Sequence, residues 1–385
     1  MKPNNPFLIS GYHSPEFFCD REQETAKILD ALSNGRNVTL IAPRRMGKTG
    51  LIRHAFYHLK EQQPEIVTLY MDIFSTQSLG DFVRLFANTV LGKLDSAPQK
   101  ALSRISQFIR SCRPVFTFDE ITGVPKVTID VAPAEEENTL KEIFDYLASS
   151  EKRCYIAIDE FQQITEYDEK GVEALLRSYI QFLPNVNFIF AGSMKHVMQE
   201  MFTSSARPFY NSTDILELKE IPADIYIPFI IDNFKKEKKN ISFETVEKVY
   251  NLFNGHTFYI QKTFNESFAD TPKGGICDIS TVENAINYII DLNETLYQEI
   301  LSNISEKQKE VLYAIAKDGT SQNLTSAQFV KRHKLTSASS VQSASKKLLE
   351  KDIITHVNKT YSLTNKFFAL WIARLYSNRN KIFID

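Results

Sequence analysis

Short runs of apolar residues alternate with helical patterns over the first 220 residues of the chain. Five of these runs have the length of a strand and predict buried strands; they lie at 37–41, 66–72, 155–158, 186–193 and 214–218. The segments between them place apolar side chains three or four residues apart, which predicts helices. Because strands that alternate with helices form parallel sheets, the predicted fold class is α/β with a parallel sheet.

Residues 113–132 break this rhythm. Their polar and apolar positions alternate with a period of two on both sides of Thr122-Gly123. Such alternation around a glycine turn is typical of a β-hairpin, so we expect a hairpin inserted into the sheet domain. An acidic Ala-Pro-Ala-Glu-Glu-Glu stretch follows it. We identify no chemistry here and interpret the insertion as a surface ribbon for contacts.

The pattern from 222–292 is helical throughout. From Ser305 onward, three helical patterns are followed by two short strand patterns, which together predict a winged helix. Ser305 and Thr325 stand at helix starts and are expected to be N-caps. The third helix, 338–350, turns short polar and basic side chains outward: Ser339, Ser340, Gln342, Ser343, Lys346 and Lys347.

The length of 385 residues exceeds one typical domain, so two or three domains are expected. We place the sheet-containing core at 1–221, a helical domain at 222–292 and the winged helix at 293–385. The segment FFALWIARLY near the end carries Trp371, the only tryptophan of the chain, and is expected to pack onto the domain body.

The four cysteines lie far apart and form no CxxC pair, so neither a zinc knuckle nor a disulfide framework is predicted. Cysteines scattered in this way are expected in a protein from a reducing compartment. The first ten residues, MKPNNPFLIS, lack an apolar signal region, and no run reaches the ~18 apolar residues of a membrane span. The expected location is the cytoplasm, without a membrane partner.

Charge is distributed unevenly, although the formal net charge is only −2. After residue 320 there are eleven basic and three acidic residues, a balance of +8, and the preceding 320 residues carry −10. A basic module therefore follows an acidic body, and a basic winged helix is a candidate for binding duplex DNA.

The first predicted strand ends in a loop, APRRMGKT, that opens the first helix. It meets the pattern G-x-x-x-x-G-K-[ST] except that Ala42 replaces the first glycine. In such a loop, backbone N–H groups and the helix N-terminus face phosphates, the Lys48 ammonium reaches the β and γ oxygens, and the Thr49 hydroxyl binds Mg²⁺. An alanine fits if its φ stays negative. The expected ATP contacts are Ala42, Pro43, Arg44, Arg45, Met46, Gly47, Lys48, Thr49 and Gly50.

A second stretch, RCYIAIDEFQQI, ends a buried strand in Asp159-Glu160. Two adjacent carboxylates at this place repel one another and lose hydration unless a cation or a polarised water compensates. Downstream of a phosphate loop, Asp159 is expected to hold Mg²⁺ through its water shell. Glu160 is expected to activate the attacking water. The alternative is an acidic N-cap for the next helix.

Further candidates lie around these two stretches. Ser193, at the end of the fourth strand, is placed to sense the γ-phosphate. Arg207 could reach the nucleotide of its own chain or of a neighbour, or be a structural arginine. In ATPases with this layout, an F-x-x-R-x-x-E element packs beside the adenine; here it contains Phe18 and Arg21, and the alternative is a plain helix start.

Three histidines near these motifs receive weaker assignments. His54 and His58 stand one helical turn apart, but no third metal ligand is evident. His256, at the start of a later helix, is interpreted as a cap or packing residue.

The set APRRMGKT, YIAIDEFQQI, FIFAGS and NGHTFYIQ resembles the archaeal-type ATPase family, which lies within the MNS group of STAND P-loop NTPases and is related to AAA+ proteins. The resemblance covers roughly residues 7–380. It implies a sheet of strand order 5-1-4-3-2, then a helical lid and a winged helix. The chain departs from the family pattern at Ala42 and at Thr257, where the lid motif usually carries proline.

These observations predict a Mg²⁺-dependent ATPase that acts as a nucleotide-driven switch, with ATP and ADP as ligands. A site that had lost hydrolysis would have no need for Glu160. The alternative is a nucleotide-binding scaffold with negligible turnover whose winged helix contacts protein. Whether the partner of 293–385 is duplex DNA, a protein or a second copy of the chain stays open.

Overall fold

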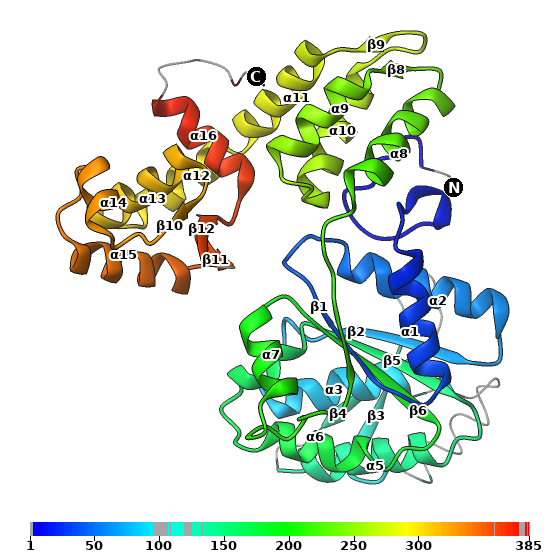
Figure 1. Ribbon diagram of the computed structural model, residues 1–385. Coiled ribbons are helices and arrows are strands. Elements are labelled where there is room, and N and C mark those ends of the chain that lie inside the picture. Colours follow the sequence, from blue (N-terminus) through cyan, green and yellow to red (C-terminus); the bar gives the residue numbers. More distant parts are fainter. Residues whose placement is uncertain are drawn as a thin grey trace. The chain divides into compact units, whose positions relative to one another are not determined.

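The computed structural model describes residues 3–91, 93–94, 107, 109–118, 125–131, 134–357, 359–376, 382 and 384. They form two compact units. One is Ser10–Glu220, and the other combines Met1–Ile9 with Ile221–Asp385. Figure 1 shows the elements of each unit.

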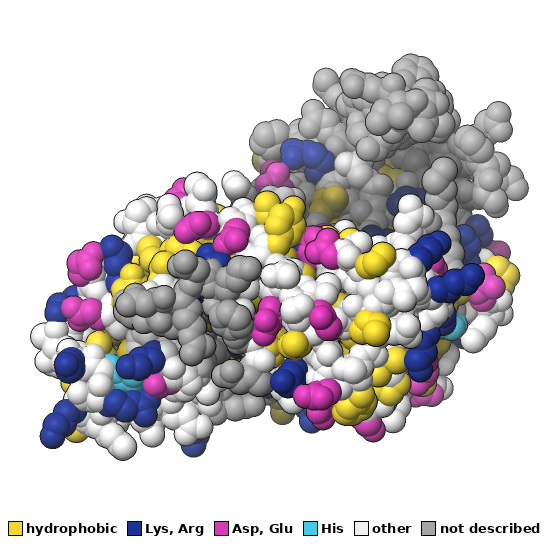
Figure 2. Space-filling view, turned by 90° about the horizontal axis from the view of Figure 1, so that it is seen from above, with side chains coloured by type: hydrophobic (Ala, Val, Ile, Leu, Met, Phe, Trp, Pro, Cys, Tyr) yellow, Lys and Arg dark blue, Asp and Glu magenta, His cyan; other side chains and the backbone are white. Residues whose placement is uncertain are grey.

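Across the described part of the chain, no helix is long and apolar enough to cross a membrane. On the face drawn in Figure 2, basic and acidic side chains are interspersed with smaller apolar groups. The cysteines in this part of the chain, Cys19, Cys154 and Cys277, are buried and free.

A five-stranded parallel sheet forms the centre of the first unit (Figure 1). Its strands are β1 (Val38–Ile41), β2 (Val67–Asp72), β5 (Cys154–Asp159), β6 (Val186–Gly192) and β7 (Asp214–Glu217). They lie in the order β2-β5-β6-β1-β7, and every neighbouring pair is parallel. Counted among these five strands alone, the order is 2-3-4-1-5. This is the predicted order 5-1-4-3-2 read from the other edge, so the fold prediction is confirmed.

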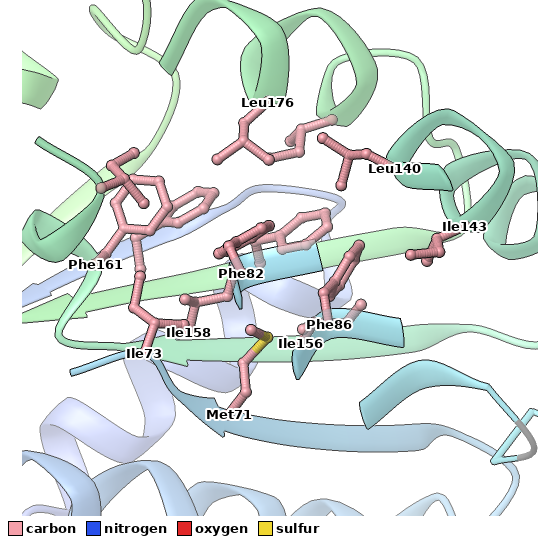
Figure 3. Close-up of a cluster of buried hydrophobic side chains, with 14 of the residues drawn as sticks. Met71, Ile73, Phe82, Phe86, Leu140, Ile143, Ile156, Ile158, Phe161 and Leu176 are labelled. Atoms are coloured by element: carbon pink, nitrogen blue, oxygen red, sulfur yellow. The ribbon is translucent and has the colours of Figure 1, made fainter. Parts of the chain in front are cut away.

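Helices cover both faces of this sheet. Among the described residues of the first unit, the α-helices are α1 (Glu22–Ser33), α2 (Lys48–Gln62), α3 (Leu79–Val90), α5 (Glu136–Ala148), α6 (Val172–Ile180) and α7 (Lys195–Thr203). The α1 and α2 helices pack on one face, and α3, α5, α6 and α7 supply the apolar residues packed on the other. Figure 3 shows the apolar cluster on the second face, in which Phe82 and Phe86 of α3 lie against Ile156 and Ile158 of β5.

The β5 strand is buried along its whole length. Its side chains alternate between the two clusters, with Ile156 and Ile158 on the α3 face and Tyr155 and Ala157 on the α2 face. A strand buried on both faces reads as a continuous apolar run, which is why it could be recognised in the sequence.

The predicted insertion forms a β-hairpin. Its strands are β3 (Cys112–Phe118) and β4 (Pro125–Val131), which pair antiparallel from Cys112↔Val131 to Phe118↔Pro125. The predicted turn at Thr122-Gly123 lies outside the described residues. The last two residues of the acidic stretch that follows, Glu136 and Glu137, begin α5.

The second unit begins with a helical bundle. It contains α8 (Ala223–Lys236), α9 (Phe243–Leu252), α10 (Thr257–Asp270) and α11 (Ile279–Leu292), with a short parallel pair of strands, β8 (Asn240–Ile241) and β9 (Ile276–Cys277). Phe7 is fully buried here and packs on Phe234, Phe264 and Phe268. Residues 3–9 therefore group with this bundle, whereas the chain from Ser10 to Glu220 belongs to the unit that contains the sheet.

The basic C-terminal region has the elements of a winged helix. They are α12 (Glu294–Ser302), α13 (Glu306–Asp318), β10 (Ser321–Gln322), α14 (Ala327–Arg332), α15 (Ala338–Glu350), β11 (Ile354–Val357), β12 (Thr360–Leu363) and α16 (Lys366–Tyr376). Ser305 caps α13 with a complete capping box, as predicted. The prediction of Thr325 as a cap was wrong, because the hydroxyl of Ser326 accepts the Phe329 N–H. Trp371 is 2% exposed and packs on Tyr297.

Candidate functional site

The loop between β1 and α2 contains two residues in the left-handed region. Arg45 has a φ of 65° and Gly47 a φ of 90°. Glycine adopts this conformation without a Cβ penalty, so Gly47 lets the chain turn directly into α2 at Lys48. Ala42 is fully buried and is not among the described residues with positive φ. The alanine therefore replaces the expected glycine without backbone strain.

The first turn of α2 faces the end of this loop. The first N–H groups of a helix have no intrahelical partner, and the helix dipole favours negative charge at this end. The helix begins at Lys48, immediately after the glycine. The backbone of residues 47–50 therefore offers a site for an anion such as a phosphate.

Lys48 lies between the two carboxylates that follow β5. Its Nζ is 2.8 Å from Oδ1 of Asp159 and 2.9 Å from Oε1 of Glu160. Lys48 is 7% exposed and Asp159 2%. Burial raises the pKa of the Asp159 carboxyl, but the Lys48 charge and the hydrogen bonds from Lys48, Thr49 and Tyr70 lower that pKa by more. The net effect keeps Asp159 ionised at neutral pH.

Two hydroxyl groups bind the second oxygen of Asp159. Thr49 Oγ1 donates to Oδ2 at 2.7 Å, and Tyr70 OH donates to the same oxygen at 2.8 Å. Tyr70 comes from β2, next to β5 in the sheet, and the Arg53 guanidinium lies 4.5 Å from its ring centroid. A hydroxyl beside a carboxylate is an oxygen donor set that suits Mg²⁺, which takes few protein ligands when phosphates and water complete its shell.

Glu160 is held through both of its oxygens. Oε1 faces Lys48, whereas Oε2 accepts hydrogen bonds from Ser193 Oγ at 2.7 Å and Gln162 Nε2 at 2.6 Å. Burial raises the pKa of the Glu160 carboxyl, and the charge of Lys48 followed by these hydrogen bonds lowers it to a net value below the ordinary one. Glu160 itself has a φ of 56°, in the left-handed region.

The structure thus brings together Lys48, Thr49, Asp159, Glu160 and Ser193, all of which were singled out in the sequence. Two members of the network were missed. Tyr70 could have been noticed as a polar ring on the strand that the expected order places beside β5. Gln162 was visible only as part of the DEFQ motif and had received no role.

The chain was compared with known families and structures. Residues 18–263 match the model of an ATPase domain found predominantly in Archaea. The chain belongs to this family. Residues 295–374 match a probable winged helix domain, as the element order of that region predicts. A search of curated protein sequences finds no match.

Solved structures share the fold of this ATPase chain. The Walker-type ATPase PABY2304 of Pyrococcus abyssi is 17% identical, with a TM-score of 0.63 over 96% of this chain and 99% of that chain. The Aeropyrum pernix ORC2 protein, in ADPNP and ADP complexes, is 12% identical, with a TM-score of 0.61 over 98% of each chain. The Aeropyrum pernix ORC1 protein in complex with DNA is 13% identical, with a TM-score of 0.55 over 97% of this chain and 96% of that chain. At these identities the likeness shows the fold alone.

Phe18 lies against the start of α2 in the ATPase domain. A Cβ added to Gly50 would lie 3.0 Å from the Phe18 ring, and the ring stacks on His54 with centroids 4.4 Å apart. Arg21 is 3% exposed, and its guanidinium donates to the Lys219 carbonyl at 2.6 Å and to Glu24 at 2.9 Å. Phe18 is therefore close to the loop, whereas the described contacts of Arg21 are structural.

The two loop arginines have different surroundings. Both side chains are exposed, and Met46 beside them is buried. The Arg44 guanidinium lies 5.9 Å from the ring centroid of Phe74, which follows β2. Arg45 is the non-glycine residue of the loop that has a positive φ.

The ion pairs described for Arg207 do not involve the phosphate loop. Its guanidinium pairs with Glu173 and is 3.5 Å from Glu200. It lines an open hollow of about 400 Å³ formed by residues 164–174 and 206–208. Within the described residues, its ion pairs are with these glutamates and not with residues 42–50.

His256 and Thr257 stand at the start of α10. His256 occupies the N-cap position without a side-chain cap bond, and its ring packs on Tyr259. Thr257 is the first residue of the helix, so α10 begins at the expected place without the usual proline.

The winged helix exposes the side chains predicted to face outward. On α15, Ser339, Gln342, Ser343, Lys346 and Lys347 are exposed and Ser340 is half-buried, whereas Val341, Ala344 and Leu348 are buried. Lys359, at the turn between β11 and β12, is exposed as well.

Proposed function

We propose that the chain binds ATP with Mg²⁺ at this loop and hydrolyses it to ADP and phosphate. The observation that carries the proposal is the convergence of Lys48, Thr49, Asp159, Glu160 and Ser193 beyond the carboxyl ends of β1, β5 and β6. Ligands of open parallel sheets bind at this edge. Membership of the ATPase-domain family supports the same conclusion.

The phosphate groups would be held by residues 42–50. The N–H groups at the start of α2 and the Lys48 ammonium would bind the β and γ oxygens. In this structure Lys48 pairs with both Asp159 and Glu160, and an arriving phosphate would offer it a second set of anions. Mg²⁺ would neutralise the charge that develops on the phosphate oxygens, held by the Thr49 hydroxyl and, through water, by Asp159.

Glu160 is the proposed general base. Once Lys48 faces the phosphates, Oε1 of Glu160 loses its partner and can accept a proton from water, while Oε2 stays bonded to Ser193. The oxygen of that water attacks the γ-phosphorus, and the bond to ADP breaks. Ser193, which follows β6, donates to Glu160 and would respond to the γ-phosphate. Arg207 has no role in this scheme.

The test is ATP binding and phosphate release by the purified chain and two variants. Lys48→Ala removes the charge that faces the β and γ oxygens and should abolish ATP binding. Glu160→Gln should bind ATP with about the wild-type affinity and lose hydrolysis, by roughly 100-fold or more. Wild-type turnover by Glu160→Gln would refute the assignment of the base. Tight ATP binding without turnover by the wild type would favour the scaffold alternative.

A second proposed function is binding of duplex DNA by 293–385, with α15 in the major groove. It is supported by the exposed Lys346, Lys347 and Lys359 and by the balance of +8 after residue 320. The ORC1 structure in complex with DNA supports it only as a protein of similar fold. If about five phosphates are neutralised, log K should fall with log salt at a slope near −4 to −5. Absence of binding by the full chain at ~50 mM salt would favour a protein partner instead.

The two functions would be coupled in a nucleotide-driven switch. Because Glu160→Gln should hold ATP without turnover, this variant separates the ATP state from the ADP state. We expect duplex DNA affinity to differ between the two states. Equal affinities in both would argue against the switch.

A further inference from the structure

Gln162 is placed to act on Glu160 and not on the nucleotide. It lies in η2 (Phe161–Glu166), the 3₁₀ turn that directly follows Glu160, and is 4% exposed. Its amide nitrogen donates to Oε2 of Glu160 at 2.6 Å. Because a carboxylate only accepts hydrogen bonds, the amide must present its NH₂ group to Glu160 and its oxygen to the other side.

Gly192 provides the space for this amide. A Cβ added to Gly192 would overlap with Oε1 of Gln162 and would lie 2.5 Å from Sδ of Met198. Gly192 is the last residue of β6, and the next residue, Ser193, supplies the second hydrogen bond to Oε2 of Glu160. Ser193 therefore provides one hydrogen-bond donor to Glu160, and Gly192 leaves the space for the other donor, the Gln162 amide.

Packing alone does not explain a glutamine at this position. Its Oε1 atom is buried and is among the side-chain oxygens without a hydrogen-bond partner in the described part of the chain. An unsatisfied buried amide oxygen is unfavourable, and an apolar side chain of the same length would avoid that cost. The bond from the other end of the amide to Glu160 is the contact that a glutamine gains here.

We propose that Gln162 is a positioning residue for the general base, and that Gly192 allows it to act. Two donors on Oε2 fix the rotation of the Glu160 carboxylate, so that Oε1 points toward α2. When Lys48 turns to the phosphates, Oε1 is then already directed at the place left for water. This inference rests on the proposed role of Glu160, and it assigns to Gln162 no contact with ATP.

The experiment compares steady-state ATP hydrolysis, ATP affinity and thermal stability of matched variants in the full chain. Gln162→Met keeps the length of the side chain and removes the donor. It should lower kcat about 10- to 100-fold, because a base misplaced by about 1 Å costs that much, while ATP affinity and the melting temperature stay close to wild type. Gln163→Met is the matched control, since Gln163 donates to the Thr76 carbonyl and does not contact Glu160. It should keep the wild-type kcat.

Two further variants separate positioning from a structural effect. Gly192→Ala should displace the amide and lower kcat in the same way, and it decides the question if Gln162→Met does not fold. In a Glu160→Gln background, Gln162→Met should cause no additional loss, because the group it positions is already absent. A wild-type kcat for the folded Gln162→Met or Gly192→Ala variant, or an equal loss in the Glu160→Gln background, would overturn the inference.

The failure of this inference can be distinguished from failure of the proposed function. If Glu160→Gln hydrolyses ATP at the wild-type rate, the assignment of the base is wrong. If Glu160→Gln stalls while Gln162→Met turns over normally, only the role of Gln162 is wrong.

Discussion

Lys48 should stabilise the nucleotide-free protein as well as bind phosphate, and Lys48→Ala tests this. The ammonium is the cation between Asp159 and Glu160, at 2.8 Å and 2.9 Å, and both Lys48 and Asp159 are buried. Removing one partner of a buried ion pair leaves an uncompensated charge and costs about 3–5 kcal/mol. For a unit of this size that loss lowers the melting temperature by about 6–20 °C.

The pH dependence of this loss follows from the two carboxylates. Their pKa values are lowered in the folded protein, so the stability they gain from Lys48 is present above the ordinary values of 4.5 for Glu160 and 3.8 for Asp159. It disappears as the pH falls through and below this range. The difference between wild type and Lys48→Ala should therefore be largest above about pH 5 and shrink as the pH falls below about 4.

Calorimetry of the full chain measures both the change in melting temperature and its dependence on pH. The transition that shifts on substitution is the unfolding of the sheet unit. Lys48→Arg is the control. It keeps the positive charge and should keep most of the stability, although a guanidinium cannot replace the compact ammonium against the phosphates. If Lys48→Ala melts at the wild-type temperature at pH 7.5, the ion cluster does not hold the nucleotide-free site together.

Four other substitutions test single residues. Separate alanine substitutions of Arg44 and Arg45 should not both weaken ATP binding, since backbone N–H groups and Lys48 should already meet the phosphates. An equal, large loss of affinity for both would contradict this. Arg207→Ala should cost about 1–2 kcal/mol of stability through its lost pairing with Glu173 and leave kcat near wild type. A ten-fold or greater fall in kcat at unchanged melting temperature would instead place Arg207 at a nucleotide. Burial lowers the pKa of His54, which is 6% exposed, from 6.5 to about 4. The free energy of unfolding should therefore fall by about 2–3 kcal/mol as the pH falls from 6.5 to 4. His54→Gln should lack this part of the acid destabilisation in pH-dependent unfolding.

The sheet and the phosphate loop could be predicted because their signals are local and long enough to be specific. A strand buried on both faces gives an unbroken apolar run, and a helix after a glycine-lysine-threonine turn gives a fixed motif. The two-residue strands β8, β9 and β10 are too short for any periodicity, so no pattern revealed them. The burial of Phe7 among Phe234, Phe264 and Phe268 depends on residues more than 220 positions away, and no neighbouring residue indicates it.

The same distinction applies inside the site. Lysine and the carboxylates are required by phosphate chemistry, so their identity could be inferred before their positions were known. The roles of Tyr70 and Gln162 could not be inferred in this way, because each role depends on which carboxylate oxygen the side chain contacts. Glycine within a buried strand is, in sequence, only a weak strand residue. The importance of Gly192 depends on the side chain of Gln162, which fills the space that a Cβ would need. That space depends in turn on the packing of β6 against η2 and α7.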